Sequence, residues 1–244
     1  MNGVQLRKIR SFVRRGGRTT TAQKRALERL WPRWGIPFCE QKLDLEAVFA
    51  RRAPRVLDIG FGDGEALLTA AANNRAVDYL GVEVHEPGIG HLLVLIERAG
   101  LDNIRIVQRD AVEVIAHMLG PSTFDSVNLF FPDPWPKKRH HKRRLIQPGF
   151  VAELARVLKN DGLVHLATDW ADYAVHARTV FANDSQFRSI EPATVCNNPL
   201  AFRPPTKFER RGRRLGHDVV DLYYLKVPRP SAVDVAAAPI ELST

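Results

Sequence analysis

Cysteine is scarce in this sequence. Its 244 residues include two cysteines, Cys39 and Cys196, which lie far apart and form no CxxC spacing. This number and spacing give no support to a disulfide framework or a structural zinc site, and they fit a reducing compartment. The sequence also has no apolar run of the roughly 18 residues that a membrane-spanning helix needs, and its start lacks the apolar stretch of a secretory signal. We therefore expect a soluble, cytoplasmic protein with no membrane partner.

Acidic residues are outnumbered by basic ones. The chain has 27 Asp and Glu against 36 Lys and Arg, for a formal net charge of +9. Such an excess favours polyanionic partners, because basic side chains neutralise phosphates and release their counterions. The basic residues are clustered, since the first 34 positions hold ten of them against one acid, Glu28. An Arg-rich, acid-poor start is also typical of an organellar transit peptide, and that alternative stays open at this point.

Periodicity divides the chain into three regions. Residues 1–50 form a basic N-terminal arm and helix, with the helix expected over 22–31, Thr20 or Thr21 as its cap and Pro32 as its end. Residues 51–227 alternate short apolar runs with four helical patterns, which predicts an α/β domain with a doubly wound, mainly parallel sheet. The expected strands are residues 55–59, 79–84, 104–108, 126–131, 163–168 and 219–227. Residues 228–244 are rich in Pro and Ala without a periodic pattern, which is typical of a flexible tail.

The first chemical motif is VLDIGFGDG at residues 56–64, a buried strand followed by a glycine-rich turn that opens a helix. Glycines such as Gly60 and Gly62 let the backbone approach a bound ligand closely. Residue 65 is Glu, so the strict GxGxxG dinucleotide fingerprint is not met. The shorter form suits an adenosyl ligand without a pyrophosphate. A tight turn that binds no ligand would use the same glycines.

Acidic residues stand at the ends of four successive predicted strands: Asp58, Glu83, Asp110 and Asp133. Ligands of parallel sheets gather at the carboxyl ends of the strands, so we expect these side chains to lie close together. Glu83 is placed to accept hydrogen bonds from both ribose hydroxyls of a nucleoside, and Asp110 to meet the adenine amino group. A single acid at a strand end is readily explained as a solvated surface side chain, but four acids at successive strand ends are harder to explain in this way. The pattern therefore indicates a nucleoside cofactor.

The segment FFPDPWPKKRHHKRR at residues 130–144 is the most specific in the chain. Its three prolines stiffen the loop and fix the direction of Asp133, which makes this carboxylate a catalytic candidate. The basic run that follows is an electrostatic footprint for phosphates, with a solvated charge run as the alternative interpretation. Its candidate RNA contacts are Lys137, Arg139, Lys142, Arg143 and Arg144. His140 and His141 have no acidic or cysteine partners in this segment, so we expect no metal site.

These motifs, in this order and spacing, resemble those of the bacterial tRNA (guanine-N7)-methyltransferase family. The resemblance runs from about residue 9 to residue 225 and is carried by QKRALERLWP (23–32), DIGFG (58–62), GVEVH (81–85), FPDPWPKKRH (131–140), ATDW (167–170) and TKFE (206–209). It implies a Rossmann-like methyltransferase fold, S-adenosylmethionine as cofactor and tRNA as partner. The implied reaction is methylation of guanine N7 at position 46 in the variable loop, which gives 7-methylguanosine.

The resemblance also implies roles for individual residues. The family's cofactor contacts fall on the four strand-end acids selected above, with Asp133 as the catalytic candidate. Its substrate contacts fall on Lys137, Asp169, Thr206, Lys207, Phe208 and Glu209. Phe208 offers either a stacking face for a base or a core side chain, and both interpretations stay open. Nearby arginines are expected to touch phosphates: Arg203, Arg210, Arg211, Arg213 and Arg214.

Three other functions compete with this one. Another S-adenosylmethionine-dependent RNA methyltransferase would use the same fold and the same charge. A nicotinamide-dependent oxidoreductase would hold a dinucleotide at residues 60–64 and Glu83, but the missing third glycine counts against it. A noncatalytic RNA-binding scaffold would leave the four strand-end acids without a role.

Overall fold

One sheet runs through the whole molecule. The computed structural model describes residues 19–214, 216 and 218–228, and within them eight strands lie in the order β1-β4-β3-β2-β5-β6-β8-β7. β8 is antiparallel to both of its neighbours, and the other pairs are parallel. The strands are β1 (Gly35–Ile36), β2 (Arg55–Ile59), β3 (Asp78–Glu83), β4 (Ile104–Gln108), β5 (Phe124–Phe130), β6 (Leu158–Thr168), β7 (Phe187–Ile190) and β8 (Val220–Lys226). The predicted doubly wound, mainly parallel α/β fold is confirmed.

All six predicted strands form, five of them within two residues of their expected bounds. β6 begins five residues earlier than expected. The pair Asp161 and Gly162 is typical of a turn, and Asp161 has a left-handed φ of 61°. Leu158 nevertheless pairs with Phe124 of β5, across a register shift in that strand. Most of the predicted arm, residues 1–18, and nearly all of the predicted tail, residues 229–244, lie outside the described residues.

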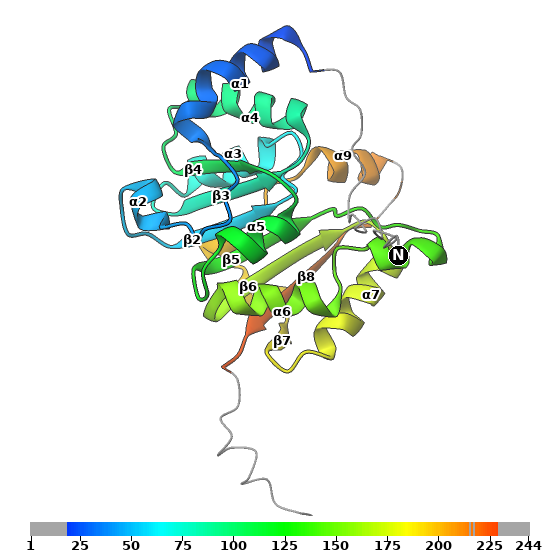
Figure 1. The fold of residues 1–244 in the computed structure, drawn as a ribbon. Helices are drawn as coiled ribbons and strands as arrows, with labels where there is room; N and C mark the ends of the chain where they lie inside the picture. The colour runs from blue at the N-terminus through cyan, green and yellow to red at the C-terminus, as the bar shows by residue number, and fades with distance from the viewer. Residues whose placement is uncertain (1–18, 215, 217, 229–244) are drawn as a thin grey trace, which may run out of the picture.

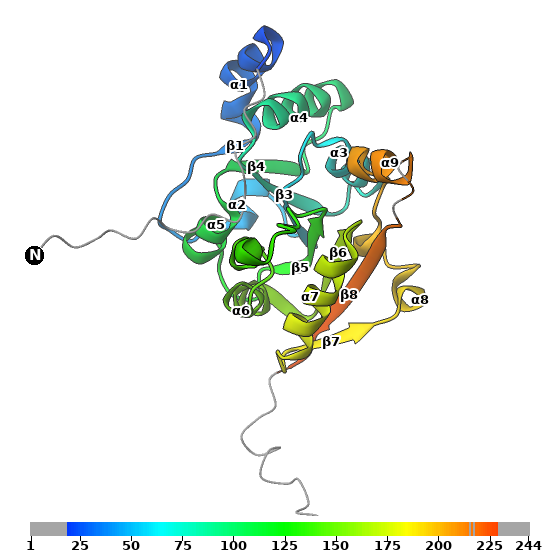
Figure 2. The ribbon, with the colours of Figure 1, turned by 90° about the vertical axis from the view of Figure 1, so that its right-hand side faces the viewer.

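Helices cover both faces of the sheet (Figures 1 and 2). One face carries α2, α5, α6 and α7, and the other carries α1, α3 and α4. A smaller cluster places α8 and the short 3-10 helix η2 against β6 and β8. The helices are α1 (Thr21–Trp34), α2 (Leu45–Phe49), α3 (Glu65–Asn73), α4 (Glu86–Ala99), α5 (Ala111–Met118), η1 (Lys138–Arg143), α6 (Pro148–Val157), α7 (Ala171–Ala182), α8 (Pro192–Val195), η2 (Pro199–Ala201) and α9 (Lys207–Arg214).

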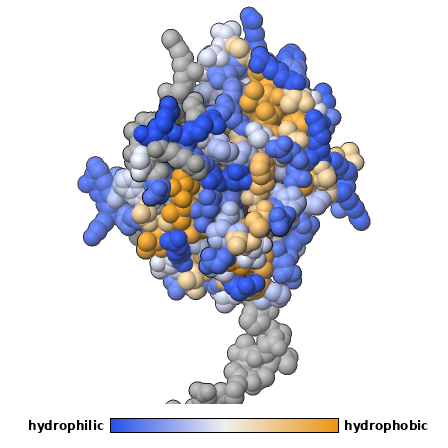
Figure 3. All heavy atoms as spheres, turned by 180° about the vertical axis from the view of Figure 1, so that it is seen from behind, coloured by the Kyte–Doolittle hydropathy of each residue, from blue (hydrophilic) through white to orange (hydrophobic). Residues whose placement is uncertain are grey.

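The surface mixes charged and apolar side chains. Figure 3 shows apolar patches separated by hydrophilic residues on the face opposite the view of Figure 1. Large exposed hydrophobic residues in the described part of the chain are Val112, Trp170, Val175 and Phe202. No helix among the described residues is long and apolar enough to cross a membrane.

α1 begins as the sequence predicts. The Thr20 hydroxyl accepts the amide of Gln23, and the Gln23 side chain accepts the amide of Thr20, which makes a reciprocal capping box. Ala26, Leu30 and Trp34 lie four residues apart, and this spacing places all three on one buried face of the helix. That face packs against α4, so α1 is held to the sheet domain by apolar contacts.

The prediction that Pro32 ends this helix is wrong, because α1 continues to Trp34. Proline lacks an N–H group and so removes one hydrogen bond from a helix, but here the loss falls in the last turn. Trp34 is 2% exposed, and its Nε1 donates to the carbonyl oxygen of Leu101 at 3.0 Å. The burial of Trp34 therefore stabilises the end of α1 more than Pro32 destabilises it.

A glycine sets the distance between α1 and α4. A Cβ atom on Gly90 of α4 would lie 2.9 Å from both the Cβ and the carbonyl oxygen of Gln23. At the surface beside this contact, Arg29 donates two hydrogen bonds of 2.6 Å to Glu97. Exposed pairs of this kind contribute about 0–1 kcal/mol, so the backbone approach matters more than the ion pair.

We predict that Gly90→Ala destabilises the protein, because the new methyl group must push α1 away from α4. Gly149→Ala in α6 is the matched control, since a Cβ there meets no atom within 4 Å. It should stabilise the helix by up to about 1 kcal/mol, the usual gain over glycine. Urea unfolding measures the stability of both variants. Limited proteolysis shows whether α1 is the segment that loosens in Gly90→Ala. Equal stability of the two variants would contradict the close contact at Gly90.

Candidate active site

The strand order reverses at β2, and the candidate site lies at this reversal. β3 pairs with one edge of β2 and β5 with the other, so Asp58 stands level with Gly81 on one side and Asn128 on the other. In doubly wound sheets such a switch point opens a crevice at the carboxyl ends of the strands. The glycine turn after β2 lies at this end of the sheet.

The glycine turn needs its glycines for conformational reasons. Gly60, Gly62 and Gly64 have φ angles of 75°, 64° and 80°, in the left-handed region that side chains disfavour. A Cβ on Gly60 would meet no atom within 4 Å, so the backbone there is open to a close neighbour. The turn therefore presents bare main chain at the end of β2.

Glu83 fixes this turn from the neighbouring strand. One of its carboxylate oxygens accepts the amide of Gly62 at 2.9 Å. The other accepts the amides of Val84 at 2.6 Å and His85 at 3.0 Å. The Glu83 side chain thus joins the turn after β2 to the start of α4. On the next strand out, Asp110 caps α5 by accepting the amide of Val112 at 3.0 Å.

Asp58 is a buried carboxyl group with weak compensation. It is 5% exposed, and the Nδ2 of Asn128 donates to it at the long distance of 3.4 Å. Burial raises the pKa of Asp58 to about 7; the Asn128 hydrogen bond opposes this increase, and the charge of Glu83 adds to it. A cation placed against Asp58 would restore the charged form.

Gly88 in α4 was missed at the level of sequence. A Cβ on this residue would lie 1.9 Å from the carbonyl oxygen of Gly62. The first turn of α4 therefore rests directly on the glycine turn, which a side chain would displace. The local signal in the sequence is the spacing of Gly88 and Gly90, two glycines within the predicted start of a helix.

One pocket joins the two halves of the candidate site. Its walls include Asp58, Gly60 and Gly62 from the glycine turn and its strand. They also include Phe130 and Phe131 from the end of β5, and Thr206 from the start of α9. Asp58, Gly60 and Gly62, which are predicted to hold a cofactor, thus share a pocket with segments predicted to meet the substrate. Glu83, Asp110 and Asp133 are not among the residues that line it.

The loop that carries Asp133 leaves β5 in an unusual conformation. Phe131 and Trp135, on either side of Asp133, have φ angles of 52° and 46°. Side chains in this left-handed region cost of order 1–3 kcal/mol each, and such strain is often found at functional sites. The amide of Phe131 donates to the carbonyl oxygen of Ala167 in β6 at 2.8 Å, so the loop starts against the strand that leads to Asp169.

The basic run separates into exposed and buried side chains. Lys137, Arg139, Lys142 and Arg143 are exposed, and the Arg143 guanidinium lies 4.9 Å from the centre of the Trp135 ring. Within the described residues, no group of three or more His, Cys, Asp and Glu side chains is placed to hold a metal ion.

Arg144 does not share the exposure of its neighbours. Its side chain is 1% exposed, donates to the carbonyl oxygen of Pro134 at 3.0 Å and pairs with Asp172 of α7. This placement argues against the expected phosphate contact, because the guanidinium already holds the Asp133 loop to α7. The pairing with Arg144 also lowers the pKa of Asp172.

The Thr206–Glu209 motif is partly structural. The Thr206 hydroxyl accepts the amide of Glu209 at 3.1 Å and so caps α9. Glu209 is 2% exposed and its carboxylate pairs with Arg203, which is itself bound to Asp221. Neither Glu209 nor Arg203 is therefore placed for the expected substrate and phosphate contacts. The side chains of Lys207 and Phe208 lie outside the described part of the structure.

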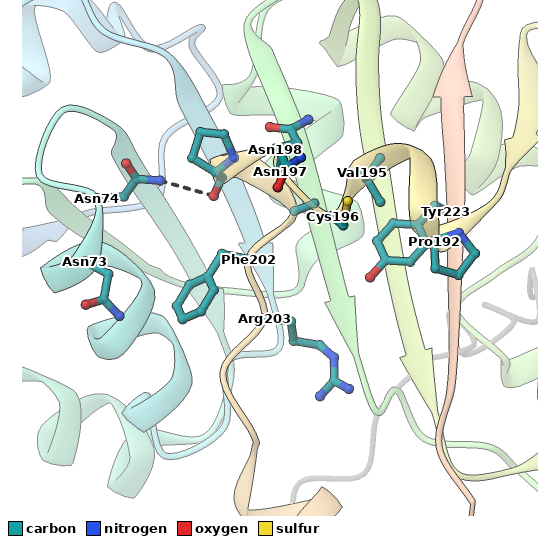
Figure 4. Close-up of a pocket in the computed structure, with 12 residues that line it drawn as sticks. Asn73, Asn74, Pro192, Val195, Cys196, Asn197, Asn198, Phe202, Arg203 and Tyr223 are labelled. Carbon is teal, nitrogen blue, oxygen red and sulfur yellow. Dashed lines mark hydrogen bonds between the residues drawn. The ribbon is translucent and has the colours of Figure 1, made fainter.

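A larger cavity, of about 460 Å³, lies between α3 and the segment that contains α8 and η2 (Figure 4). Asn73, Phe202 and Tyr223 are among the residues that line it, and Arg203 lies at the end opposite Asn198. Of the residues predicted from the sequence to bind a ligand, Arg203 is the one that lines this cavity. Its size alone gives it no chemistry, whereas the smaller pocket gathers the buried carboxyl and the open glycine backbone.

Comparisons with known proteins identify the family to which this chain is similar. Residues 52–222 match the model of a family described as "Putative methyltransferase". A tRNA (guanine-N(7)-)-methyltransferase of Alkalilimnicola ehrlichii is 53% identical over 230 residues, which are 92% of this chain and 95% of that protein. One of Halorhodospira halophila is 54% identical over 221 residues, 90% of this chain and 96% of that protein. The solved 16S rRNA methyltransferase KamB, 17% identical, has a TM-score of 0.53 over 77% of this chain and 95% of its own, a likeness of fold.

We predict that Asp58→Asn gains stability relative to the native chain as the pH rises from 5 to 8. The pKa of Asp58 is about 7 in the folded protein, against an ordinary value of 3.8. Between these values the folded state binds more protons than the unfolded state, so the free energy of unfolding falls as the pH rises. The fall is at most about 1.4 kcal/mol per pH unit inside this window, and the variant lacks it.

Urea unfolding at pH 5, 6, 7 and 8 measures this difference. Asp161→Asn is the control, because it removes one exposed carboxylate and leaves the pocket untouched. A pH-independent difference for Asp58→Asn would show that Asp58 is ionised throughout this range.

Proposed function

This chain belongs to the family of bacterial tRNA (guanine-N7)-methyltransferases, and we propose that it methylates N7 of the guanine at position 46 in the variable loop of tRNA. S-adenosylmethionine is the proposed methyl donor and 7-methylguanosine the product. Relatives of this name are 53% and 54% identical over at least nine-tenths of the chain. The structural observation that carries the proposal is the pocket shared by the glycine turn, the end of β5 and Thr206.

The residues present fit S-adenosylmethionine, which supplies a methyl group on a positively charged sulfur and also carries an ammonium group. Asp58 is a buried carboxyl group that a cation would stabilise in its charged form. Gly60 and Gly62 offer open backbone to the ligand, and Glu83 and Asp110 stand at the ends of the next two strands for the ribose and the adenine. We propose these residues as the cofactor site, with Asp133 at its substrate side.

The proposed chemistry places few demands on the protein beyond alignment. Guanine N7 carries a free lone pair and no proton, so attack on the methyl group needs no strong base. Alignment of reacting groups can contribute up to roughly 7–11 kcal/mol. The strained, proline-rich loop holds Asp133 in a fixed direction, and Asp169 follows the adjacent strand. Either carboxylate can accept hydrogen bonds from the N1 and N2 edge of guanine and stabilise the positive charge that the ring gains.

The exposed part of the basic run is the proposed phosphate track. Its members are Lys137, Arg139, Lys142 and Arg143. Arg143 and His140 both pack against the Trp135 ring, at 4.9 and 5.8 Å from its centre. Trp135 lies two residues after Asp133, so phosphates bound by this run would bring the RNA to the catalytic loop.

We predict that the protein transfers a labelled methyl group from S-adenosylmethionine to unmodified tRNA, and that strand scission at 7-methylguanosine maps the product to position 46. A transcript with 7-deazaguanine at this position should accept no methyl group, because it lacks the nucleophilic nitrogen. Asp133→Asn and Asp169→Asn, assayed in single turnover with saturating cofactor and RNA, should separate the roles of the two carboxylates.

Transfer that survives the 7-deazaguanine substitution would point to a different nucleophile and to another RNA methyltransferase activity. Cofactor binding without transfer to any tRNA would point to a different substrate. Near-native single-turnover rates for both Asp variants would remove the carboxylates from the mechanism.

We predict that the substitution of two neighbouring arginines affects different properties, RNA binding for Arg143 and stability for Arg144. Arg143→Ala should weaken tRNA binding and reduce the slope of log affinity against log salt concentration by about 1, the value for one lost phosphate contact. Arg144→Ala should leave this slope unchanged and lower the stability by about 1–3 kcal/mol, because the carbonyl oxygen of Pro134 loses its donor. Filter binding over a salt series and thermal unfolding measure the two effects. A reduced slope for Arg144→Ala would show that this residue contacts RNA after all.

A further inference from the structure

A chain of buried and partly buried polar side chains runs from the sheet to α9. His165 of β6 is fully buried, and its Nε2 lies 2.7 Å from Oδ1 of Asp221 on β8. Arg203 donates to both carboxylate oxygens of Asp221, at 2.8 and 3.0 Å. A further nitrogen of the same guanidinium pairs with Glu209 in α9. Arg203 therefore connects β8 to α9, the helix that precedes this strand in the chain.

The electrostatics show that Arg203 holds this chain together. Its side chain is 10% exposed, and that of Glu209 is 3% exposed. Burial alone would raise the pKa of Asp221, but hydrogen bonds from His165 and Arg203 hold it at about 2. Burial also lowers the pKa of His165, which favours its neutral form. This cation is costly to remove, because the buried carboxylate of Glu209 and the partly buried carboxylate of Asp221 both lose their guanidinium partner.

Two members of this chain, Arg203 and Glu209, contact segments of the candidate active site. The Arg203 guanidinium lies 5.8 and 5.9 Å from the ring centres of Phe130 and Phe131, which line the pocket and begin the Asp133 loop. The amide of Glu209 is capped by Thr206, which lines the same pocket. Arg203 thus contacts the two segments that face the glycine turn across this pocket.

We propose that Arg203 is a positioning residue for methyl transfer, which sets Thr206, the cap of α9, and the start of the Asp133 loop against the cofactor pocket. This inference rests on the proposed function. It assigns no substrate contact to Arg203 or to Glu209. Glu209 acts through Arg203, as the anchor that attaches α9 to β8.

The test compares Arg203→Lys, Glu209→Gln and the double variant. Lysine keeps the charge but lacks the fork of donors that holds Asp221 and Glu209 at the same time. We expect Arg203→Lys to lower the single-turnover rate by about 10- to 100-fold, the effect of a small misalignment, with tRNA affinity and its salt slope unchanged. Because both residues act as one unit, the effects of the single variants should not add in the double variant.

A matched control separates positioning from general loss of structure. Arg51 donates two hydrogen bonds to Asp78, a fully buried carboxylate at the start of β3, far from the carboxyl ends of the strands. Arg51→Lys should lower the stability without changing the rate at saturating tRNA and cofactor. If Arg203→Lys fails to fold, Asp221→Asn replaces it, since this variant weakens the same anchor and keeps the arginine.

Hydrogen exchange of the α9 amides gives a readout that does not depend on activity. Exchange in α9 should speed up in Arg203→Lys and stay unchanged in Arg51→Lys. An unchanged rate and unchanged exchange in Arg203→Lys would overturn the proposal, and so would a parallel loss of tRNA affinity and salt slope. If the native protein methylates no tRNA, the proposed function fails, while the exchange experiment still decides whether Arg203 anchors α9.

Discussion

Three backbone amides converge on the Glu83 carboxylate, and the edge of the sheet that faces the pocket depends on this set of bonds. One amide comes from Gly62, in the turn after β2, and two come from the start of α4. Because Glu83 holds both segments, Gly88 of α4 can rest on the carbonyl oxygen of Gly62, where no side chain would fit. The same helix receives α1 at Gly90. The N-terminal helix and the glycine turn thus belong to one continuous packed unit.

This set of bonds also limits what Glu83 can offer a ligand. A carboxylate has about four lone-pair sites for hydrogen bonds, and three are directed at backbone amides. Glu83 can therefore accept about one further hydrogen bond before it must release an amide. One ribose hydroxyl fits this limit, whereas the sequence led us to expect two. The benefit of the arrangement is preorganisation, because the side chain does not have to be ordered when a nucleoside binds.

The sequence predicts the strands and their acidic ends well because those signals are local. An apolar run followed by glycine or an acid marks the end of a parallel strand, and parallel strands place their ends together. Features that depend on distant partners were missed. Pro32 remains within α1 because Trp34 is buried against a carbonyl group 67 residues away. In the sequence, Arg144 and Arg203 look like their exposed neighbours. The carboxylates that pair with them, Asp172 and Asp221, lie 28 and 18 residues further along the chain, so no local pattern reveals the pairing.

These two arginines contact the Asp133 loop before and after Asp133 in the sequence. Arg144 holds the carbonyl oxygen of Pro134 and pairs with α7, whereas Arg203 lies beside Phe130 and Phe131 and pairs with β8. Strained φ angles in the loop persist only if the surroundings fix them, and the two guanidinium groups supply that support. Under the proposed function, the exposed cations of the basic run can then bind a flexible polyanion without moving the Asp133 carboxylate. The basic segment would in that case have two physical roles, set by burial: its outer charges attract phosphate, and the inner charge of Arg144 keeps the loop in place.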